Sequence, residues 1–267
     1  MTKYILIGLI FSLWCGGGIS DLYAQQQALP IQTLIIDPGH GGKDPGAVGK
    51  NKYEKDIALK VAKYLRDTLQ TYYRQMNIVL TRETDTFIPL HERGRIAQDA
   101  KGDFFISIHC NAMKQKDRQG AETYVLGVNK GQEGYETVIK ENQAMLFEEN
   151  HADVYGGFDP HSPEGLIYLQ VLKDVFRNES LQMAQRLQNN YRENLGRIDR
   201  GVKQAPFVVL YMSGMPAVLT EIGFISNLKE ESYLAKDTGQ KEIAYAIFDA
   251  IRGYQEALQM QQIRGDK

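Results

Sequence analysis

Cysteine is scarce in this sequence of 267 residues, which contains only Cys15 and Cys110. Small secreted domains that depend on disulfides carry many more cysteines, so a disulfide framework is excluded. If a leader containing Cys15 is removed, Cys110 remains alone and no intramolecular disulfide can form. Cys110 stands at the end of an apolar run, which favours a packed small side chain over a nucleophile.

The sequence also lacks an excess of charge of one sign. Its formal net charge is −2, and it contains no long basic tract. Because proteins that bind the phosphate backbone usually carry a strongly basic surface, nucleic acid is excluded as a partner. Internal repeats and linkers are absent as well, so residues 25–267 are interpreted as one domain, which we expect to be a monomer.

The first 24 residues differ in kind from the rest. Lys3 supplies a positive start, Tyr4–Cys15 is apolar, and small residues follow from Gly16 towards Ala24. This order is typical of a signal peptide, and the apolar run is shorter than the ~20 residues of a membrane span. We expect cleavage after Ala24 and secretion across the inner membrane into the periplasm. A lipoprotein signal modified at Cys15 and an uncleaved anchor are the alternatives.

Short apolar runs alternate with helical patterns along the first half of the remaining chain. The predicted strands are 31–36, 77–81, 103–109 and 121–128, and the predicted helices are 55–69 and 89–100. This alternation predicts an α/β fold with a twisted, mixed but mostly parallel sheet that is flanked by helices. In such sheets, functional sites gather at the carboxyl ends of the strands.

The pattern weakens between residues 129 and 170, where the sequence is first acidic and then rich in glycine and proline. We interpret this stretch as an insertion that holds a short helix and a loop. After it, the sequence predicts a helix over 172–195, strands over 207–211 and 217–222, and a closing helix over 242–258.

Two of the five histidines, His40 and His109, stand at the ends of apolar strands. The topology places both at the same edge of the sheet, and imidazole is a common metal ligand. Catalytic zinc is often bound by two histidines and one glutamate, with one position left for water. Glu54 heads the first helix after a loop that turns back from His40. We therefore predict a zinc site formed by His40, Glu54 and His109.

Each of these signals also has a purely structural explanation. A histidine at a strand end is commonly just hydrogen-bonded, and Glu54 could simply complement the dipole of its helix. The glycines after Asp37 could make turns, or cradle a phosphate. No Gly-Lys-Ser/Thr ending or dinucleotide fingerprint accompanies them, however. The other histidines, His91, His151 and His161, are interpreted as structural or surface residues.

Glu221 is the candidate catalytic residue, because it ends the apolar strand AVLTE. A carboxylate in such a place is costly unless it is paired, solvated in a cleft or close to a metal. A nearby carboxylate can take the proton of a zinc-bound water, whose pKa is lowered to about 7. The alternative role for Glu221 is a structural salt bridge.

Five segments, in this order, carry a resemblance to a known family: LIIDPGHGGKDPGAVG, YEKDIAL, LTRETDTFIPLHERGRIAQ, FFISIHCNA and PAVLTEIGFISN. Together they resemble the zinc-dependent N-acetylmuramoyl-L-alanine amidases of the AmiA/AmiB/AmiC type, over nearly the whole chain after the leader. The resemblance implies zinc on His40, Glu54 and His109 and a catalytic role for Glu221. It also implies the substrate, peptidoglycan, in which the amide between N-acetylmuramic acid and L-alanine is hydrolysed during wall remodelling and daughter-cell separation.

The insertion at 129–170 falls where relatives involved in cell division carry a regulatory helix. Our hypothesis is that Glu141 or Glu148 caps the metal in a resting state and that an activator protein displaces the segment. The alternative is a solvated surface loop. Cys110 replaces the family's usual small residue after the second histidine, and it should point away from His109 on a strand.

Two other functions remain open on the sequence. A zinc peptidase that cuts within the stem peptide could use the same ligands. A catalytically inactive wall-binding or activator module is the third alternative, although it would have no need of His40, Glu54, His109 and Glu221 together.

Overall fold

The computed structural model describes residues 29–127, 132–148 and 163–265. The predicted leader and its cleavage site lie outside these residues, as do His151 and His161. In the described part of the chain, no helix is both long and apolar enough to cross a membrane.

A central sheet with the order β2-β1-β3-β6-β4-β5 organises the described residues. All neighbouring strands run parallel except β4 and β6, which are antiparallel. The predicted α/β fold with a mixed, mostly parallel sheet is therefore confirmed. The strands are β1 (Thr33–Pro38), β2 (Asn77–Leu80), β3 (Phe104–Asn111), β4 (Ala121–Leu126), β5 (Asp199–Ala205) and β6 (Ala217–Phe224).

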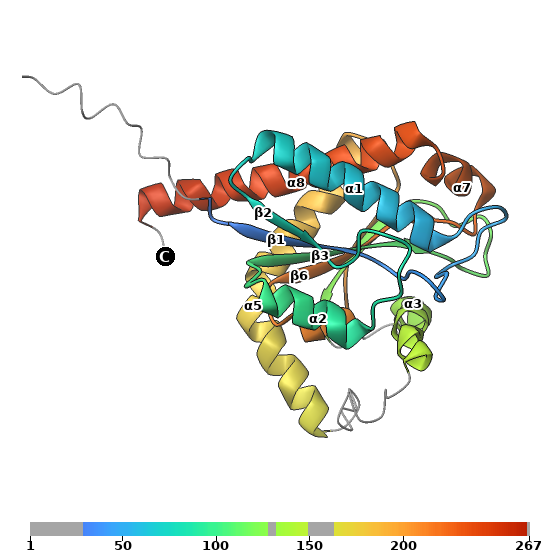
Figure 1. Ribbon diagram of the computed structural model, residues 1–267, viewed down its shortest axis with the longest axis horizontal. Coiled ribbons are helices and arrows are strands. Elements are labelled where there is room, and N and C mark those ends of the chain that lie inside the picture. The colour runs from blue at the N-terminus through green and yellow to red at the C-terminus, as the bar shows by residue number, and fades with distance from the viewer. Residues whose placement is uncertain (1–28, 128–131, 149–162, 266–267) are drawn as a thin grey trace, which may run out of the picture.

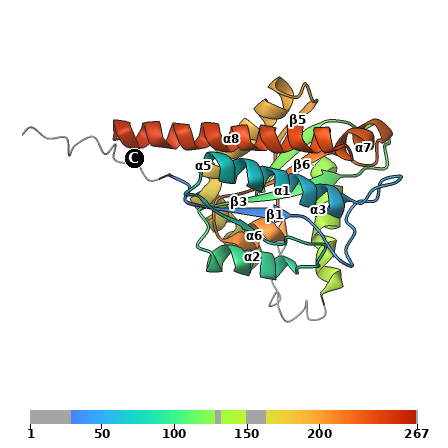
Figure 2. The same ribbon diagram turned by 45° about the horizontal axis from the view of Figure 1, so that its top comes forward.

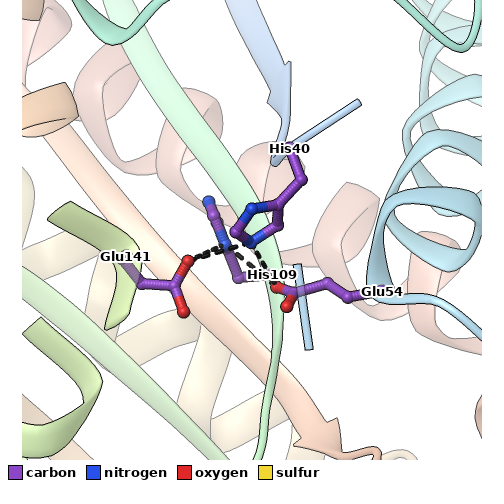
Figure 3. A group of neighbouring side chains, drawn as sticks. All are labelled: His40, Glu54, His109 and Glu141. Carbon is purple, nitrogen blue, oxygen red and sulfur yellow. Dashed lines mark hydrogen bonds and ion pairs between the residues drawn. The ribbon is translucent and has the colours of Figure 1, made fainter. Parts of the chain in front are cut away.

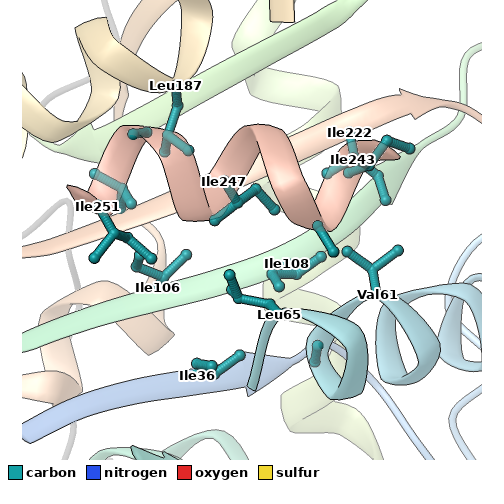
Figure 4. Close-up of a cluster of buried hydrophobic side chains, with 14 of the residues drawn as sticks. Ile36, Val61, Leu65, Ile106, Ile108, Leu187, Ile222, Ile243, Ile247 and Ile251 are labelled. Atoms are coloured by element: carbon teal, nitrogen blue, oxygen red, sulfur yellow. The ribbon is translucent and has the colours of Figure 1, made fainter. Parts of the chain in front are cut away.

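Helices cover both faces of this sheet (Figures 1 and 2). On one face, α1, α5 and α8 pack over the larger apolar core, in which Leu65, Leu187 and Ile247 meet Ile106 and Ile108 of β3 (Figure 4). On the other face, α2 and α6 enclose a smaller core around Phe105 and Leu219. The helices are α1 (Glu54–Tyr72), α2 (Leu90–Asp99), α3 (Gln132–Asn142), α5 (Pro163–Glu193), α6 (Val208–Ser213), α7 (Leu228–Leu234), α8 (Asp237–Arg264) and the 3₁₀ helix η1 (Gln143–Phe147).

The structure corrects two sequence predictions. The predicted strand at 207–211 is wrong, because this segment forms the short helix α6, which ends at Gly214 with a left-handed backbone. Five residues of continuous apolar character fit a buried strand and a buried helix equally well. Glu221 does not end its strand but lies inside β6, which continues to Phe224.

Within 129–170, the expected short helix is present as α3, followed by η1. Val138 of α3 and Ala144 of η1 join the smaller core, and Asn142 binds the start of α6. α3 and η1 are therefore packed onto the domain rather than projecting from it as a solvated loop.

Candidate metal centre

The loop after β1 holds His40 in an unusual conformation. His40 has a φ of 59°, in the left-handed region that side chains other than glycine seldom adopt. Two buried arginines fix the backbone here: Arg82 donates to the carbonyls of Pro38 and Gly39, and Arg93 donates to those of Pro38 and His40. Strained residues that are held in this way cluster at functional sites.

Four side chains meet at the carboxyl edge of the sheet (Figure 3). One ligand atom from each of His40, Glu54, His109 and Glu141 lies within 4.8 Å of all the others, and all four residues are buried. The three ligands predicted from the sequence are thus brought together. Glu141 of α3 joins them from the other side, as Figure 3 shows.

The individual distances within this cluster are short. Nε2 of His40 lies 3.2 Å from Oε1 of Glu54 and 2.9 Å from Oε2 of Glu141. Nδ1 of His109 lies 3.0 Å from the same oxygen of Glu54 and 2.9 Å from the same oxygen of Glu141. Two imidazole nitrogens and two carboxylate oxygens thus converge on one point.

Backbone amides orient the carboxylate of Glu54, the first residue of α1. Ala47 donates its N–H to Oε2 over 2.6 Å, and Cys110 donates its N–H to Oε1 over 2.7 Å. Two glycines allow the close packing around these groups. A Cβ on Gly39 would lie 2.4 Å from the His109 ring, and one on Gly46 would lie 2.5 Å from the His40 ring.

Asp44 is a partner of the centre that the sequence analysis missed. Its Oδ2 lies 2.8 Å from Nδ1 of His40, the ring nitrogen that faces away from the cluster. Carboxylates in this position fix the tautomer and orientation of metal-binding histidines. The sequence signal that could have identified Asp44 is its position four residues after His40.

The charges of the cluster shift the pKa values of its members strongly. Burial alone would lower the pKa of His40, but Glu54 and Glu141 raise it well above its usual value. Burial opposes the charged form of His109 too, yet Glu141 and Glu54 raise its pKa to about 10. Glu141 is disfavoured by burial and by Glu54, but the two histidines lower its pKa to about 2.

Glu221 lies next to the cluster but, unlike its members, has a carboxylate that is unpaired within the described chain. It is fully buried, and among the described residues neither of its carboxylate oxygens has a hydrogen-bond partner. Burial raises its pKa well above the usual value, and Glu141 and Glu54 add to the effect. Its Cα is paired with that of His109 across β3 and β6, so the candidate catalytic residue and a candidate ligand are neighbours.

The four side chains of the cluster form a donor set that suits a metal ion. Within the described part of the chain, Nε2 of His40 and both oxygens of Glu141 are buried and make no hydrogen bond of good geometry, although Nε2 lies only 2.9 Å from Oε2 of Glu141. Buried polar atoms are normally satisfied, and exceptions of this kind call for an ion or water. Histidine and carboxylate ligands suit zinc and related transition metals. The residues therefore fit a metal ion.

The other candidate residues lie elsewhere. Glu148 binds Nδ1 of His91 at 3.0 Å and accepts the N–H of Leu90, so it does not reach the centre. Of the two glutamates proposed to cap the metal, only Glu141 is in position. Cys110 is buried in the larger apolar core and is the free cysteine of the described chain.

Comparison with known proteins agrees with this arrangement. Residues 34–253 match the family model of N-acetylmuramoyl-L-alanine amidase. The N-acetylmuramoyl-L-alanine amidase AmiC of Escherichia coli O6:H1 is 33% identical over 228 residues, which cover 83% of this chain and 52% of the relative. This chain thus matches about half the length of AmiC.

Two solved structures extend the comparison. The amidase from Clostridium difficile 630 is 29% identical, with a TM-score of 0.62 over 84% of this chain and 96% of that one. The CwlD amidase from Clostridioides difficile, solved in complex with the GerS lipoprotein, is 26% identical. It has a TM-score of 0.61 over 85% of this chain and 99% of that one. This chain belongs to the N-acetylmuramoyl-L-alanine amidase family.

Proposed function

We propose that this protein is a zinc-dependent N-acetylmuramoyl-L-alanine amidase that hydrolyses the amide between N-acetylmuramic acid and L-alanine in peptidoglycan. One observation carries the proposal: the unpaired, buried carboxylate of Glu221 lies beside a buried cluster of two histidines and two glutamates. A binding module would have no use for a base that is placed next to metal ligands.

His40, Glu54 and His109 would hold the metal through Nε2, Oε1 and Nδ1, the atoms that converge in the cluster. Zinc in such a site lowers the pKa of bound water to about 7 and polarises the substrate carbonyl. Asp44 would keep Nε2 of His40 available by accepting a hydrogen bond from Nδ1. The amides of Ala47 and Cys110 would hold the carboxylate of Glu54 in place.

Glu221 would act as the general base and then as the general acid. In the first step it takes a proton from the attacking water, and the oxygen of that water bonds to the amide carbon. In the second step the bond from carbon to nitrogen breaks, and Glu221 gives the proton to the nitrogen of L-alanine. The free carboxylate oxygens of Glu221 suit it for both transfers.

The described chain would be in a resting state, with α3 as the inhibitory element. Glu141 reaches both histidines and takes the side of the centre that water and substrate need. Further contacts fasten the helix: Thr137 accepts a hydrogen bond from Asn111, and Asn142 binds Pro206 and Val208. Displacement of α3 would therefore be required for activity.

An activator protein could supply that displacement. The related CwlD amidase was solved in complex with a lipoprotein, which supports a protein partner for this chain. The activator of this chain would have to compete for the contacts of α3 and η1. It would act in the periplasm during daughter-cell separation, after the predicted leader has been removed at Ala24. N-terminal sequencing of the protein recovered from the periplasm tests this location, and we expect Gln25 as its first residue.

The reaction is tested by product analysis. The purified protein and its Glu141→Ala and Glu221→Gln variants are incubated with peptidoglycan, with and without a chelator, and the products are identified by mass. Intact stem peptides with a free L-alanine amine would support the amidase, provided that chelator and Glu221→Gln both abolish them. Peptides cut internally would indicate a peptidase. No product from the wild type or from Glu141→Ala would favour a binding module.

A further inference from the structure

A cavity lies at the edge of the sheet that holds the candidate metal centre. Its volume is about 610 Å³, and three segments line it: the loop at 48–50, the loop at 116–119 and residues 226–229 at the start of α7. We call it the lysine pocket. All three segments follow the carboxyl ends of β1, β3 and β6, so the pocket belongs to the same edge of the sheet as the metal centre. In Figure 1, the blue loop after β1 and α7 lie on the same side of the molecule.

The charge of the lysine pocket is positive. Lys50, Lys116 and Lys229 line it, against a single acidic residue, Asp117. The ion pairs found in the described structure include none of these three lysines, whereas Lys55, Lys203 and Lys241 each have a carboxylate partner. Three unpaired ammonium groups around one cavity attract an anion.

Apolar side chains complete the wall. Val48 is 57% exposed and Leu228 is 59% exposed, and both line the pocket. Exposed apolar side chains beside unpaired cations favour a ligand that carries carboxylates on a partly apolar frame. A bare inorganic anion would leave Val48 and Leu228 without a role.

Hydrogen bonds between the three segments make the pocket pre-formed. Asn227 donates from Nδ2 to the carbonyl of Lys116, and Met113 donates its N–H to Ser226. The N–H of Asn51 binds the carboxylate of Glu231 over 2.6 Å. Each loop is thus tied to the start of α7, so a ligand would not have to order the loops on binding.

Residues that line the pocket are close neighbours in the chain of residues at the centre. Val48 follows Ala47, whose N–H holds the carboxylate of Glu54. Ser226 lies five residues after Glu221 along the same strand and turn, and Ile225 bonds the carbonyl of Asn111 at the end of β3. None of the described residues that line the pocket belongs to α3, so the position of α3 over the centre does not close it.

We propose that the lysine pocket binds the acidic stem peptide of the substrate and so sets which peptides the enzyme accepts. This inference rests on the proposed function. In a stem peptide that begins L-alanyl-D-glutamyl, the glutamate carboxylate would meet Lys50, Lys116 and Lys229 while the alanine methyl group meets Val48 and Leu228. The peptide leaving the scissile amide would run along the sheet edge from the centre into the pocket.

Binding of the free peptide tests the inference without any cleavage. Isothermal titration measures the affinity of the purified protein for L-alanyl-D-glutamyl peptides and for the same peptides with the glutamate carboxylate amidated. The Lys116→Glu/Lys229→Glu variant is compared with Lys60→Glu, which changes an exposed lysine on α1, outside the pocket. We expect the double variant to bind the acidic peptide about tenfold more weakly, and Lys60→Glu to bind like the wild type.

Several results would overturn the proposal. Equal affinity of the wild type for acidic and amidated peptides would remove the role of the carboxylates. Unchanged binding by the double variant, at an unchanged melting temperature, would remove the role of the lysines. If inorganic phosphate competes as well as the peptide does, the site is a general anion site and the assignment to the stem peptide is wrong.

The failure of the inference and that of the proposed reaction can be told apart. If Glu141→Ala releases no product but the acidic peptide binds through the lysines, the proposed reaction is wrong while the proposed role of the lysine pocket in peptide binding is supported. If product forms, the inference predicts that the double variant loses about tenfold in kcat/KM on acidic peptides. On amidated ones it would lose little. Equal losses on both substrates would contradict the role of the pocket in selection.

Discussion

His109 and Glu221 face each other as a Cα pair across the parallel strands β3 and β6. The register of two buried strands therefore fixes the spacing between a candidate metal ligand and the candidate base. Sheets are rigid supports for a site, because a shift of one residue would turn every side chain to the opposite face. Because the backbone positions are fixed in this way, single substitutions at the site should change its activity or its metal affinity without changing the fold.

Glu221→Gln should remove activity while leaving the fold and the metal site in place. Glutamine has the shape of glutamate but cannot take a proton, so kcat/KM should fall by about 10²–10⁴-fold. Steady-state kinetics on a soluble muramyl peptide measures the loss, in the Glu141→Ala background if the wild type is silent. The bound metal, measured by elemental analysis, should stay at the level of the parent protein. Activity close to that of the parent would exclude Glu221 as the base.

Glu141→Gln should raise basal activity, because the capping carboxylate loses its charge. Glu141 lies 2.9 Å from a nitrogen of each histidine, so its neutralisation weakens the contact that holds α3 over the centre. A coupling of 1–3 kcal/mol would give a rise of roughly 5–150-fold.

Glu148→Gln is the matched control for this change. Glu148 lies in the same insertion and is buried, but it binds His91 and Leu90 instead of the centre. Its substitution should leave basal activity within about twofold of the wild type, unless it loosens the whole insertion. Similar increases in both variants would indicate general loosening instead of a specific cap at the metal site.

Asp44→Asn should weaken metal binding about 10–100-fold, since partners of ligating histidines commonly contribute that much. Asp44 contacts Nδ1 of His40 at 2.8 Å and would not touch the metal itself. Competition against a chromophoric chelator gives the affinity. Asp85→Asn is the control, because Asp85 binds Gly42 and Lys55 in the same region without contacting His40. Equal affinities in both variants would leave Asp44 without a positioning role.

The sequence was most informative where apolar runs end in polar residues. β1, β3 and β6 are central strands, and each could be recognised from its apolar run. Because parallel strands end at one edge, topology predicted that His40 and His109 would meet, and Glu54 was added from its place at the start of the first helix. β5 was missed: its residues, DRGVKQA, are largely polar and half-buried, so they carry no strand pattern.

Contacts between distant segments could not be predicted. Glu141 and Glu148 looked equivalent in the sequence, and only the packing of α3 and η1 separates their partners. The sequence analysis did not single out Lys140 of α3 either. Burial alone would lower the pKa of Lys140, but the carboxylates of Glu54, Glu141 and Glu221 raise it. Arg82 and Arg93 bind the loop of His40 from other elements, a role that charge patterns along the chain do not reveal.

The last prediction concerns the buried pair beneath the centre, Asp37 and Arg93. Arg93 donates to Oδ1 of Asp37 over 2.8 Å, and Thr81 and Ser107 donate to the same carboxylate. Burial alone would raise the pKa of Asp37, but Arg93 and the two hydroxyl groups lower it below the ordinary 3.8. The folded protein thus binds this proton more weakly than the unfolded chain does.

The pair should therefore stabilise the fold at neutral pH, and this stability should be lost as the pH falls through about 4 and below. Asp37→Asn leaves Arg93 buried without its counter-charge, so about 3–5 kcal/mol should be lost at pH 7. Melting temperatures of both proteins between pH 7 and pH 3 measure the difference, which should shrink at the acidic end. Asp67→Asn, on the exposed face of α1, should change little at any pH. A difference for Asp37→Asn that stays constant or grows in acid would mean that the charge of Asp37 is not what stabilises the loop of His40.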